Sequence, residues 1–121
     1  MSDDAGDMPA RNRTAGNRTV CEVIITADDE GWLVDFTRSL VADRLAACGH
    51  HQPIRAVYRW QGAIQEERET RVALQTRQSL VATIIERARE AHPYDVPCVL
   101  TLPVLDGNPA YLEWVLAETD G

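Results

Sequence analysis

Short stretches of alternating or continuous apolar residues predict four strands in this chain. The β-branched run from Thr19 to Thr26 predicts the first strand, and the run from Ile54 to Trp60 predicts the second. From Ile64 to Thr76, apolar and charged residues alternate with the period of a strand that has one buried face. The nearly continuous apolar run from Cys98 to Leu105 predicts a fourth, buried strand.

Between these stretches, apolar residues recur at helical spacing and predict three helices. The first begins at Asp28 or Asp29, both good N-cap residues, and runs to about Ala47, before Gly49 stops it. The second follows a cap at Thr76 or Ser79, and the short third one begins with Asn108 as N-cap and Pro109 at the first helical position. The apolar stripes of the three helices are Leu33, Phe36, Leu40, Val41 and Ala47; Leu80, Ile84, Ile85, Ala88 and Ala91; and Leu112, Val115 and Leu116.

In chain order, these elements form a β-α-β-β-α-β series with a helix added at the end. This order predicts an α+β fold, namely a ferredoxin-like sandwich with an antiparallel sheet and a short C-terminal helix. Residues 1–18 are polar and show no periodicity, so we expect a disordered N-terminal leader. Residues 19–121 are then a single domain.

The third predicted strand is too long for a domain of this size. At roughly 3.3 Å per residue it spans about 43 Å, whereas a domain of about 100 residues has a radius of gyration near 13 Å. The strand must therefore bend or project, and we expect its acidic first half, Glu66 to Glu69, to overhang. Because an unpaired projecting edge would invite aggregation, we expect it to pair with another subunit.

Composition and charge narrow the range of functions. The formal net charge of -7 makes the protein a poor binder of phosphate backbones, so no nucleic-acid partner is expected. All 12 basic residues are Arg, and the absence of Lys excludes Schiff-base catalysis and a Walker-type phosphate loop. Three cysteines without a Cys-x-x-Cys pair indicate neither a disulfide scaffold nor a zinc finger. Neither a signal segment nor a membrane-length apolar run is visible, so we expect a cytoplasmic protein with no membrane partner.

The turn His92-Pro93-Tyr94-Asp95-Val96-Pro97-Cys98 carries the sharpest candidate chemistry. Its two prolines stiffen the backbone, and imidazole and thiolate are good ligands for Cu and Zn. His92 and Cys98 are therefore the candidate metal ligands, with an acid from a neighbouring subunit as the alternative to Cys98. The alternative is that His92 caps the preceding helix and that Cys98 is a small buried apolar residue.

Aromatic and acidic residues offer a second, less specific set of candidates. Tyr58, Trp60 and Tyr94 could line a ligand pocket with polar tips, or could be core and interface aromatics. Glu67 and Glu69 resemble an acid pair on one strand face, and Glu69 is the tentative pocket member. The alternative is that both lie on a solvated face or pair with Arg68 and Arg71 of other strands.

Two further patterns count against a metal site shared by two neighbouring histidines and against an enzyme. His50 and His51 are neighbours that point to opposite faces of an extended segment, so they cannot share one ion. The chain contains no nucleophile with a base and an orienting group, so we do not expect an enzyme.

Four short motifs together resemble the CutA-type divalent cation tolerance proteins. The motifs are His-Pro-Tyr-x-x-Pro at 92–97, Leu45-Ala46-Ala47-Cys48, Trp60-Gln61-Gly62 and Tyr111-x-x-Trp114, and the resemblance covers about 19–118 in the expected order. It implies the same ferredoxin-like fold, a homotrimer, and binding of divalent copper and related ions, with the His of His-Pro-Tyr often implicated.

This chain departs from the family pattern at three places. Cys98 stands where a Glu usually follows the Pro, which would make an acid-containing site softer. Gln75 stands where a Lys usually precedes the Thr, and Gly49-His50 replaces the usual Val-Asn.

The sequence therefore favours a homotrimer that binds a divalent metal of the copper type and contributes to metal tolerance, with no obligatory cofactor. A second hypothesis comes from another class of protein. The fold and trimeric assembly also resemble nitrogen-regulatory signalling trimers, so a signalling or adaptor trimer with a small ligand in its intersubunit clefts is the alternative.

Overall fold

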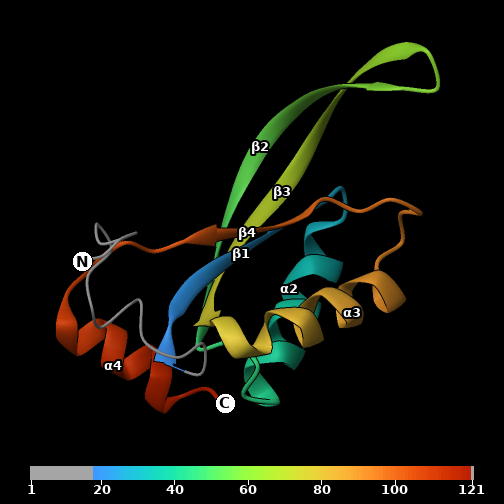
Figure 1. The fold of residues 1–121 in the computed structure, drawn as a ribbon. Helices are drawn as coiled ribbons and strands as arrows, with labels where there is room; N and C mark the ends of the chain where they lie inside the picture. Colours follow the sequence, from blue (N-terminus) through green and yellow to red (C-terminus); the bar gives the residue numbers. More distant parts are fainter. Residues whose placement is uncertain (1–17, 121) are drawn as a thin grey trace.

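Four strands form one antiparallel sheet in the computed structural model, which describes residues 18–120 (Figure 1). The elements are β1 (Val20–Ala27), α2 (Glu30–Ala42), β2 (Cys48–Trp60), β3 (Ala63–Arg77), the 3₁₀ turn η2 (Gln78–Leu80), α3 (Val81–Ala91), β4 (Val99–Pro103) and α4 (Pro109–Ala117). The strand order is β2-β3-β1-β4, which confirms the predicted ferredoxin-like α+β fold. The predicted leader lies outside the described residues except for Arg18. No helix within residues 18–120 is both long and apolar enough to cross a membrane.

Helices α2 and α3 cover one face of the sheet and enclose the main core. Val23 and Ile25 of β1 and Val72 and Leu74 of β3 point to this face, because positions two apart in a strand point the same way. They pack against the apolar sides of the two helices, as the sequence pattern predicted. The helical members of this core are Leu33, Phe36, Leu40, Ile84 and Ala88.

The opposite face of the sheet is covered by α4 at one end only (Figure 1). Val20 and Ala47 pack there against Leu112, Val115 and Leu116 of α4. Farther along β4, Leu100 and Leu102 keep 58% and 39% of their surface exposed. The fourth strand is therefore shorter and less buried than expected, because it is an edge strand and one of its faces has no covering layer within the described residues.

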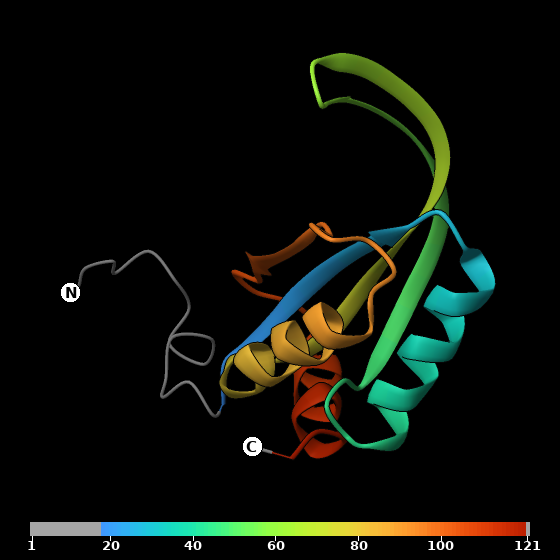
Figure 2. The same ribbon diagram turned by 90° about the vertical axis from the view of Figure 1, so that its right-hand side faces the viewer.

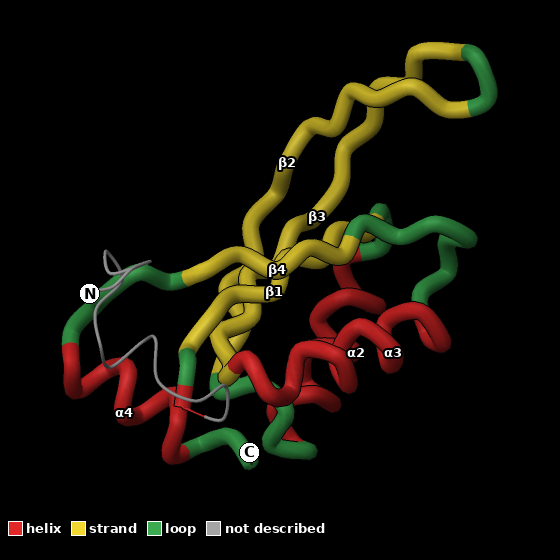
Figure 3. Tube along the Cα trace, viewed as in Figure 1, coloured by secondary structure: helices red, strands yellow, loops and turns green. Residues whose placement is uncertain are grey.

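Strands β2 and β3 form a hairpin that extends well past the rest of the domain (Figures 2 and 3). Their pairing is continuous from Cys48 opposite Gln75 to Trp60 opposite Ala63. Gln61 and Gly62 both have positive φ, at 52° and 82°, as a tight two-residue hairpin turn requires. The predicted overhang of the long strand is confirmed.

Strand β2 begins six residues earlier than the predicted strand at Ile54. Pro53 is tolerated because β2 is an edge strand, where a missing N–H can face away from its single neighbour. Gly49 lies where a side chain would collide with the helix layer, since an added Cβ would be 2.7 Å from the Thr37 methyl carbon. The glycine therefore allows close packing of α2 on β2.

Helix α2 ends at Ala42, five residues before the predicted end. Arg44 adopts the left-handed conformation, with φ 61°, and its N–H bonds the Val41 carbonyl while the Leu45 N–H bonds the Leu40 carbonyl. This pair of bonds is a Schellman motif, which usually uses Gly at the position of Arg44.

The predicted N-caps of the three helices are partly confirmed. Asp29 and Asn108 cap α2 and α4, accepting bonds from Trp32 N and Ala110 N respectively. The expected cap of α3 at Thr76 or Ser79 was wrong, because η2 leads into this helix and its N-cap position, Leu80, offers no side-chain acceptor. The Thr76 hydroxyl instead donates to the Leu45 carbonyl at 2.6 Å.

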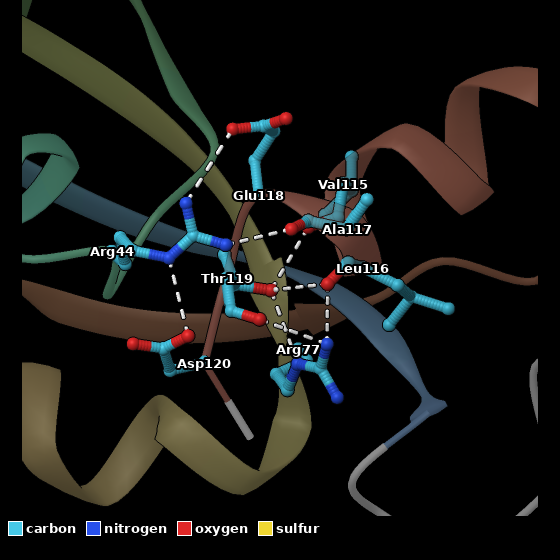
Figure 4. A network of polar contacts seen from close by, with 8 residues as sticks. All are labelled: Arg44, Arg77, Val115, Leu116, Ala117, Glu118, Thr119 and Asp120. Atoms are coloured by element: carbon cyan, nitrogen blue, oxygen red, sulfur yellow. Dashed lines mark hydrogen bonds and ion pairs between the residues drawn. The ribbon is translucent and has the colours of Figure 1, made fainter.

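Two arginines fix the C-terminal end of α4 (Figure 4). Arg77, at the end of β3, donates to the Leu116 carbonyl, and to the carbonyl and hydroxyl of Thr119 at 2.9 and 3.1 Å. Arg44 donates to the Ala117 carbonyl at 2.8 Å and pairs with Asp120 at 3.1 Å. These contacts satisfy carbonyl groups that a helix end leaves without intrahelical partners.

We expect Arg77→Ala to lower the free energy of unfolding by about 2–4 kcal/mol, because several charge-assisted hydrogen bonds to a part-buried helix end are lost. Arg38→Ala is the control, since the single ion pair of Arg38 within residues 18–120 is the exposed one with Asp35 on α2, and its loss should cost less than about 0.5 kcal/mol. Urea unfolding at equal protein concentration checks both values, and equal losses would contradict the role assigned to Arg77.

Tyr111 also ties α4 to the sheet, because its hydroxyl donates to Gln75 Oε1 at 2.9 Å. Burial, together with the hydrogen bond to Cys48, raises the pKa of Tyr111 from 10.0 to about 12. A raised pKa in the folded state means that the stabilisation is complete below pH 10 and is lost as the pH rises toward 12. We therefore expect Tyr111→Phe to lose less stability than the wild type between pH 10 and 12, measured by urea unfolding across that range. An identical alkaline decline in both proteins would refute this assignment.

Candidate functional site

His92 is buried at the point where α3 ends and the proline-bracketed turn begins. It is the C-cap of α3, and the residue as a whole is 7% exposed. Nδ1 accepts a bond from Tyr94 N at 3.0 Å, so Nε2 carries the proton that is donated to the Thr26 carbonyl at 2.8 Å. The rings of Trp32 and Tyr94 flank it, with centroids 4.9 and 4.8 Å away. His92 therefore joins α3, the turn and the end of β1, and both of its ring nitrogens are in use.

Cys98, the other predicted metal ligand, is an exposed free thiol just before β4. Within residues 18–120, no three His, Cys, Asp or Glu side chains come close enough together to hold a metal ion. A metal bound by His92 and Cys98 would have to replace one of the two hydrogen bonds of the His92 ring, and this pair stays a prediction.

The structure brings several predicted pocket residues together at the base of the hairpin. Glu69 is 8% exposed, and its Oε2 accepts a bond from the Tyr94 hydroxyl at 3.2 Å. Glu67 lies two positions away on the same strand face, and its Oε1 accepts from the Tyr58 hydroxyl at 2.8 Å. We call these four residues, together with Asp28, the hairpin neck. The solvated acidic face that was the alternative for Glu69 is wrong, because the turn covers this carboxylate.

Both tyrosines of the hairpin neck are affected by the negative charge around them. Burial, followed by the charges of Glu69 and Asp28, raises the pKa of Tyr94 far above its usual range. The hydrogen bond to Glu67 is the main cause that raises the pKa of Tyr58, and the charges of Glu67, Glu69 and Asp28 act in the same direction. The carboxylates of Glu67, Glu69 and Asp28 therefore all help to raise the pKa values of both tyrosines.

Trp60, the remaining predicted pocket residue, lies at the tip of the hairpin beside the turn and is 45% exposed. It is remote in register from Glu69, which pairs with Ile54. Asp28, which sequence reasoning did not select, follows the end of β1 at Ala27, which pairs with Thr70 of β3. It belongs to the neck because its negative charge helps to raise the pKa values of both Tyr58 and Tyr94, and where β1 stops relative to β3 cannot be read from the sequence alone.

His50, His51 and Cys48, at the start of β2, do not belong to the hairpin neck. His51 Nε2 lies 3.1 Å from the Thr37 hydroxyl on the helix-covered face, while His50 points to the other face. Cys48 donates to Gln75 Oε1 at 2.7 Å, and the Gln75 amide donates to Glu22 at 2.6 Å. Gln75 thus gives Glu22 a hydrogen bond without contributing a positive charge.

Comparison with known proteins places this architecture in one family. The family model of the CutA1 divalent ion tolerance protein matches residues 21–118. Protein CutA of Mus musculus is 39% identical over 103 residues, which cover 84% of this chain and 58% of that protein. The divalent-cation tolerance protein CutA of Pyrococcus horikoshii is 42% identical over 82 residues, covering 68% of this chain and 80% of that protein.

The solved structures agree with the sequence comparison. The divalent cation tolerance protein CutA1 of Thermus thermophilus superposes with a TM-score of 0.80 at 34% identity, over 84% of this chain and 100% of that one. This chain spans about three-fifths of the length of its mammalian relatives and all of the solved Thermus thermophilus chain. The chain belongs to the CutA1 divalent ion tolerance protein family.

Proposed function

We propose that this protein is a homotrimer that binds a divalent metal ion of the copper type and contributes to metal tolerance. The relatives named as divalent-cation tolerance proteins support the metal and tolerance parts of this proposal. The role proposed is that of a binding protein and not an enzyme.

The proposed assembly rests on two exposed apolar areas, one on the projecting hairpin and one on the uncovered face of the sheet. Val57 and Ile64 are 64% and 69% exposed on the projecting hairpin, and Trp60 adds further apolar surface at its tip. Leu100 and Leu102 leave a second apolar area on the sheet face opposite α2 and α3. Surface of this kind is typical of protein interfaces, and a neighbour's hairpin on the open sheet would bury both areas. The family resemblance supplies the number three.

The predicted copper ligands remain His92 and Cys98. The stiff backbone between them reduces the ordering cost of ligation, and the exposed Cys98 thiol is accessible to an incoming ion. Binding at His92 replaces the bond from Nε2 to Thr26 or the bond from Tyr94 to Nδ1, so metal binding should be coupled to movement of the turn.

We expect the purified protein to have three times its chain mass of 13.5 kDa by light scattering coupled to gel filtration. Leu102→Glu should shift the mass toward the monomer, because it places a charge in the proposed interface. Val41→Glu is the matched control, since Val41 is 38% exposed on the outer helix layer and Leu102 is 39% exposed. A monomeric wild type, or equal effects of the two substitutions, would refute the proposed assembly.

For copper, we expect His92→Ala and Cys98→Ser each to weaken binding about tenfold or more, because each removes one proposed ligand. Calorimetric titration of the three proteins measures the affinities, and circular dichroism checks that each is folded. Wild-type affinity in both variants would show that His92 and Cys98 have structural roles only.

A further inference from the structure

We propose that Arg59 on the hairpin of one copy binds Glu22 on the sheet of a second copy, and that this ion pair fixes how the hairpin is seated. The inference rests on the proposed homotrimer and deepens it, because it names the charged groups that meet in the interface. Glu22 lies on the sheet face opposite α2 and α3, directly across from Leu102. We call this face the open face, because α4 covers it at one end only.

The side chain of Glu22 is held in place by groups that carry no positive charge. Gln75 Nε2 donates to Glu22 Oε2 at 2.6 Å. Gln75 Oε1 accepts from Cys48 at 2.7 Å and from the Tyr111 hydroxyl at 2.9 Å. Because two donors occupy this oxygen, the amide nitrogen of Gln75 must face Glu22. The orientation of Glu22 is therefore fixed, while its charge is not neutralised.

Glu22 has no positive partner in the described part of its own chain. The residue is half-buried, and no cation within residues 18–120 forms an ion pair with it. Its Oε1 also has no hydrogen-bond partner in that range. A carboxylate in partly dry surroundings attracts a cation more strongly than one in bulk water, because the local dielectric constant is lower. The counter-charge of Glu22 must therefore come from another segment or another chain.

The projecting hairpin carries arginines that lack partners. Within residues 18–120, Arg59, Arg68 and Arg71 are the arginines with neither an ion pair nor a side-chain hydrogen bond, and all three lie on β2 or β3. Arg59 lies near the tip, directly opposite Ile64 and two positions from Val57, so these three side chains share one face. Val57 and Ile64 are 64% and 69% exposed. This face therefore presents a free cation between two exposed apolar side chains.

The open face has the complementary pattern. Leu102, directly across from Glu22, is 39% exposed, and Leu100 farther along is 58% exposed. When the apolar areas of hairpin and sheet cover each other, the Arg59 guanidinium and the Glu22 carboxylate meet in surroundings from which water is largely excluded. Opposite charges placed in this way fix the register of an interface and reject wrong arrangements, because a shifted register would leave both charges unpaired.

The hairpin is long enough to make this contact. Thr70, where β3 loses β1 as a neighbour, is paired with Pro53 of β2. From Pro53 to Trp60 the hairpin extends about 23 Å, at roughly 3.3 Å per residue, whereas a four-stranded sheet is only about 14 Å wide. A hairpin that projects from one copy can therefore reach across the open face of the next.

Charge reversal tests the pair in the intact protein, and sedimentation equilibrium measures the concentration of half-assembly. Arg59→Glu and Glu22→Arg each bring like charges together, so we expect each to raise this concentration about tenfold or more. The double variant, which carries both substitutions, restores an opposite pair with the charges exchanged. It should return the concentration of half-assembly to within about threefold of the wild type.

Two reversals of exposed side chains in the helix layer are the matched controls. Arg38→Glu on α2 matches Arg59→Glu, and Glu90→Arg on α3 matches Glu22→Arg. Both should leave the concentration of half-assembly within about twofold of the wild type, because neither side chain lies on the open face or on the hairpin.

A further variant guards against loss of folding in Glu22→Arg. Glu22→Gln keeps an acceptor for the Gln75 amide and removes only the charge. Arg59→Glu should therefore disrupt assembly less in a Glu22→Gln background than in the wild type. Because Arg59 is exposed, Arg59→Glu should keep the circular dichroism spectrum of the wild type.

The outcomes separate the ion pair from the assembly itself. Unchanged assembly of Arg59→Glu, or a double variant that is not rescued although both single variants dissociate, would overturn the pair. If the wild type is trimeric in that case, the proposed assembly stands, whereas a monomeric wild type refutes both. Disruption by Glu22→Arg alone would overturn Arg59 as the partner and assign another occupant to Glu22.

Discussion

The early end of β1 is the constraint on which the rest of this structure depends. Strand β3 is paired on both sides only as far as Thr70, where β1 ends at Ala27. Beyond that point it has β2 as its single neighbour for the remaining length of the hairpin. Glu69 is the first residue of β3 past the end of β1, so the candidate site lies where a four-stranded sheet becomes a two-stranded ribbon.

The turn after α3 closes this end of the sheet. Through its two ring nitrogens, His92 joins the Thr26 carbonyl at the end of β1 to the backbone of Tyr94. Tyr94 then reaches Glu69 on β3. Three segments far apart in sequence are thus connected by three hydrogen bonds, and a change at any one of them would be felt by the other two.

The two faces of the sheet have different physical roles. One face is sealed by α2 and α3, and the packing there is close enough that Gly49 cannot carry a side chain. The other face is secured by α4 at one end, through Arg77 and Tyr111, and exposes Leu100 and Leu102 farther along. Exposed apolar surface of this kind is typical of protein interfaces, so this face is the one on which the proposed assembly rests.

Much of the fold could be predicted from the sequence, because local rules determine it. Apolar periodicity gave the number, type and order of the elements, and capping residues such as Asp29 and Asn108 marked two helix starts. The excess length of the third strand predicted a projecting hairpin from dimensions alone. The motifs around His92 and Trp60 also pointed to the CutA-type family before any contact was known.

Local rules failed where a tertiary contact overrides them. Gly49 and Pro53 look like strand breakers, but an edge position and a close helix make both suitable for β2. Arg44 ends α2 in a conformation that usually favours Gly, while its side chain binds the C-terminal segment.

The candidate site shows the same division between local and tertiary information. Sequence reasoning selected His92, Glu69 and Tyr94, but only the structure showed that the ring nitrogens of His92 are already bonded and that Glu69 is buried. The sequence by itself determined which groups are present and on which strand face they lie, because that information is periodic. Which of them meet depends on strand register and on where each strand stops, and long-range packing alone decides those two features.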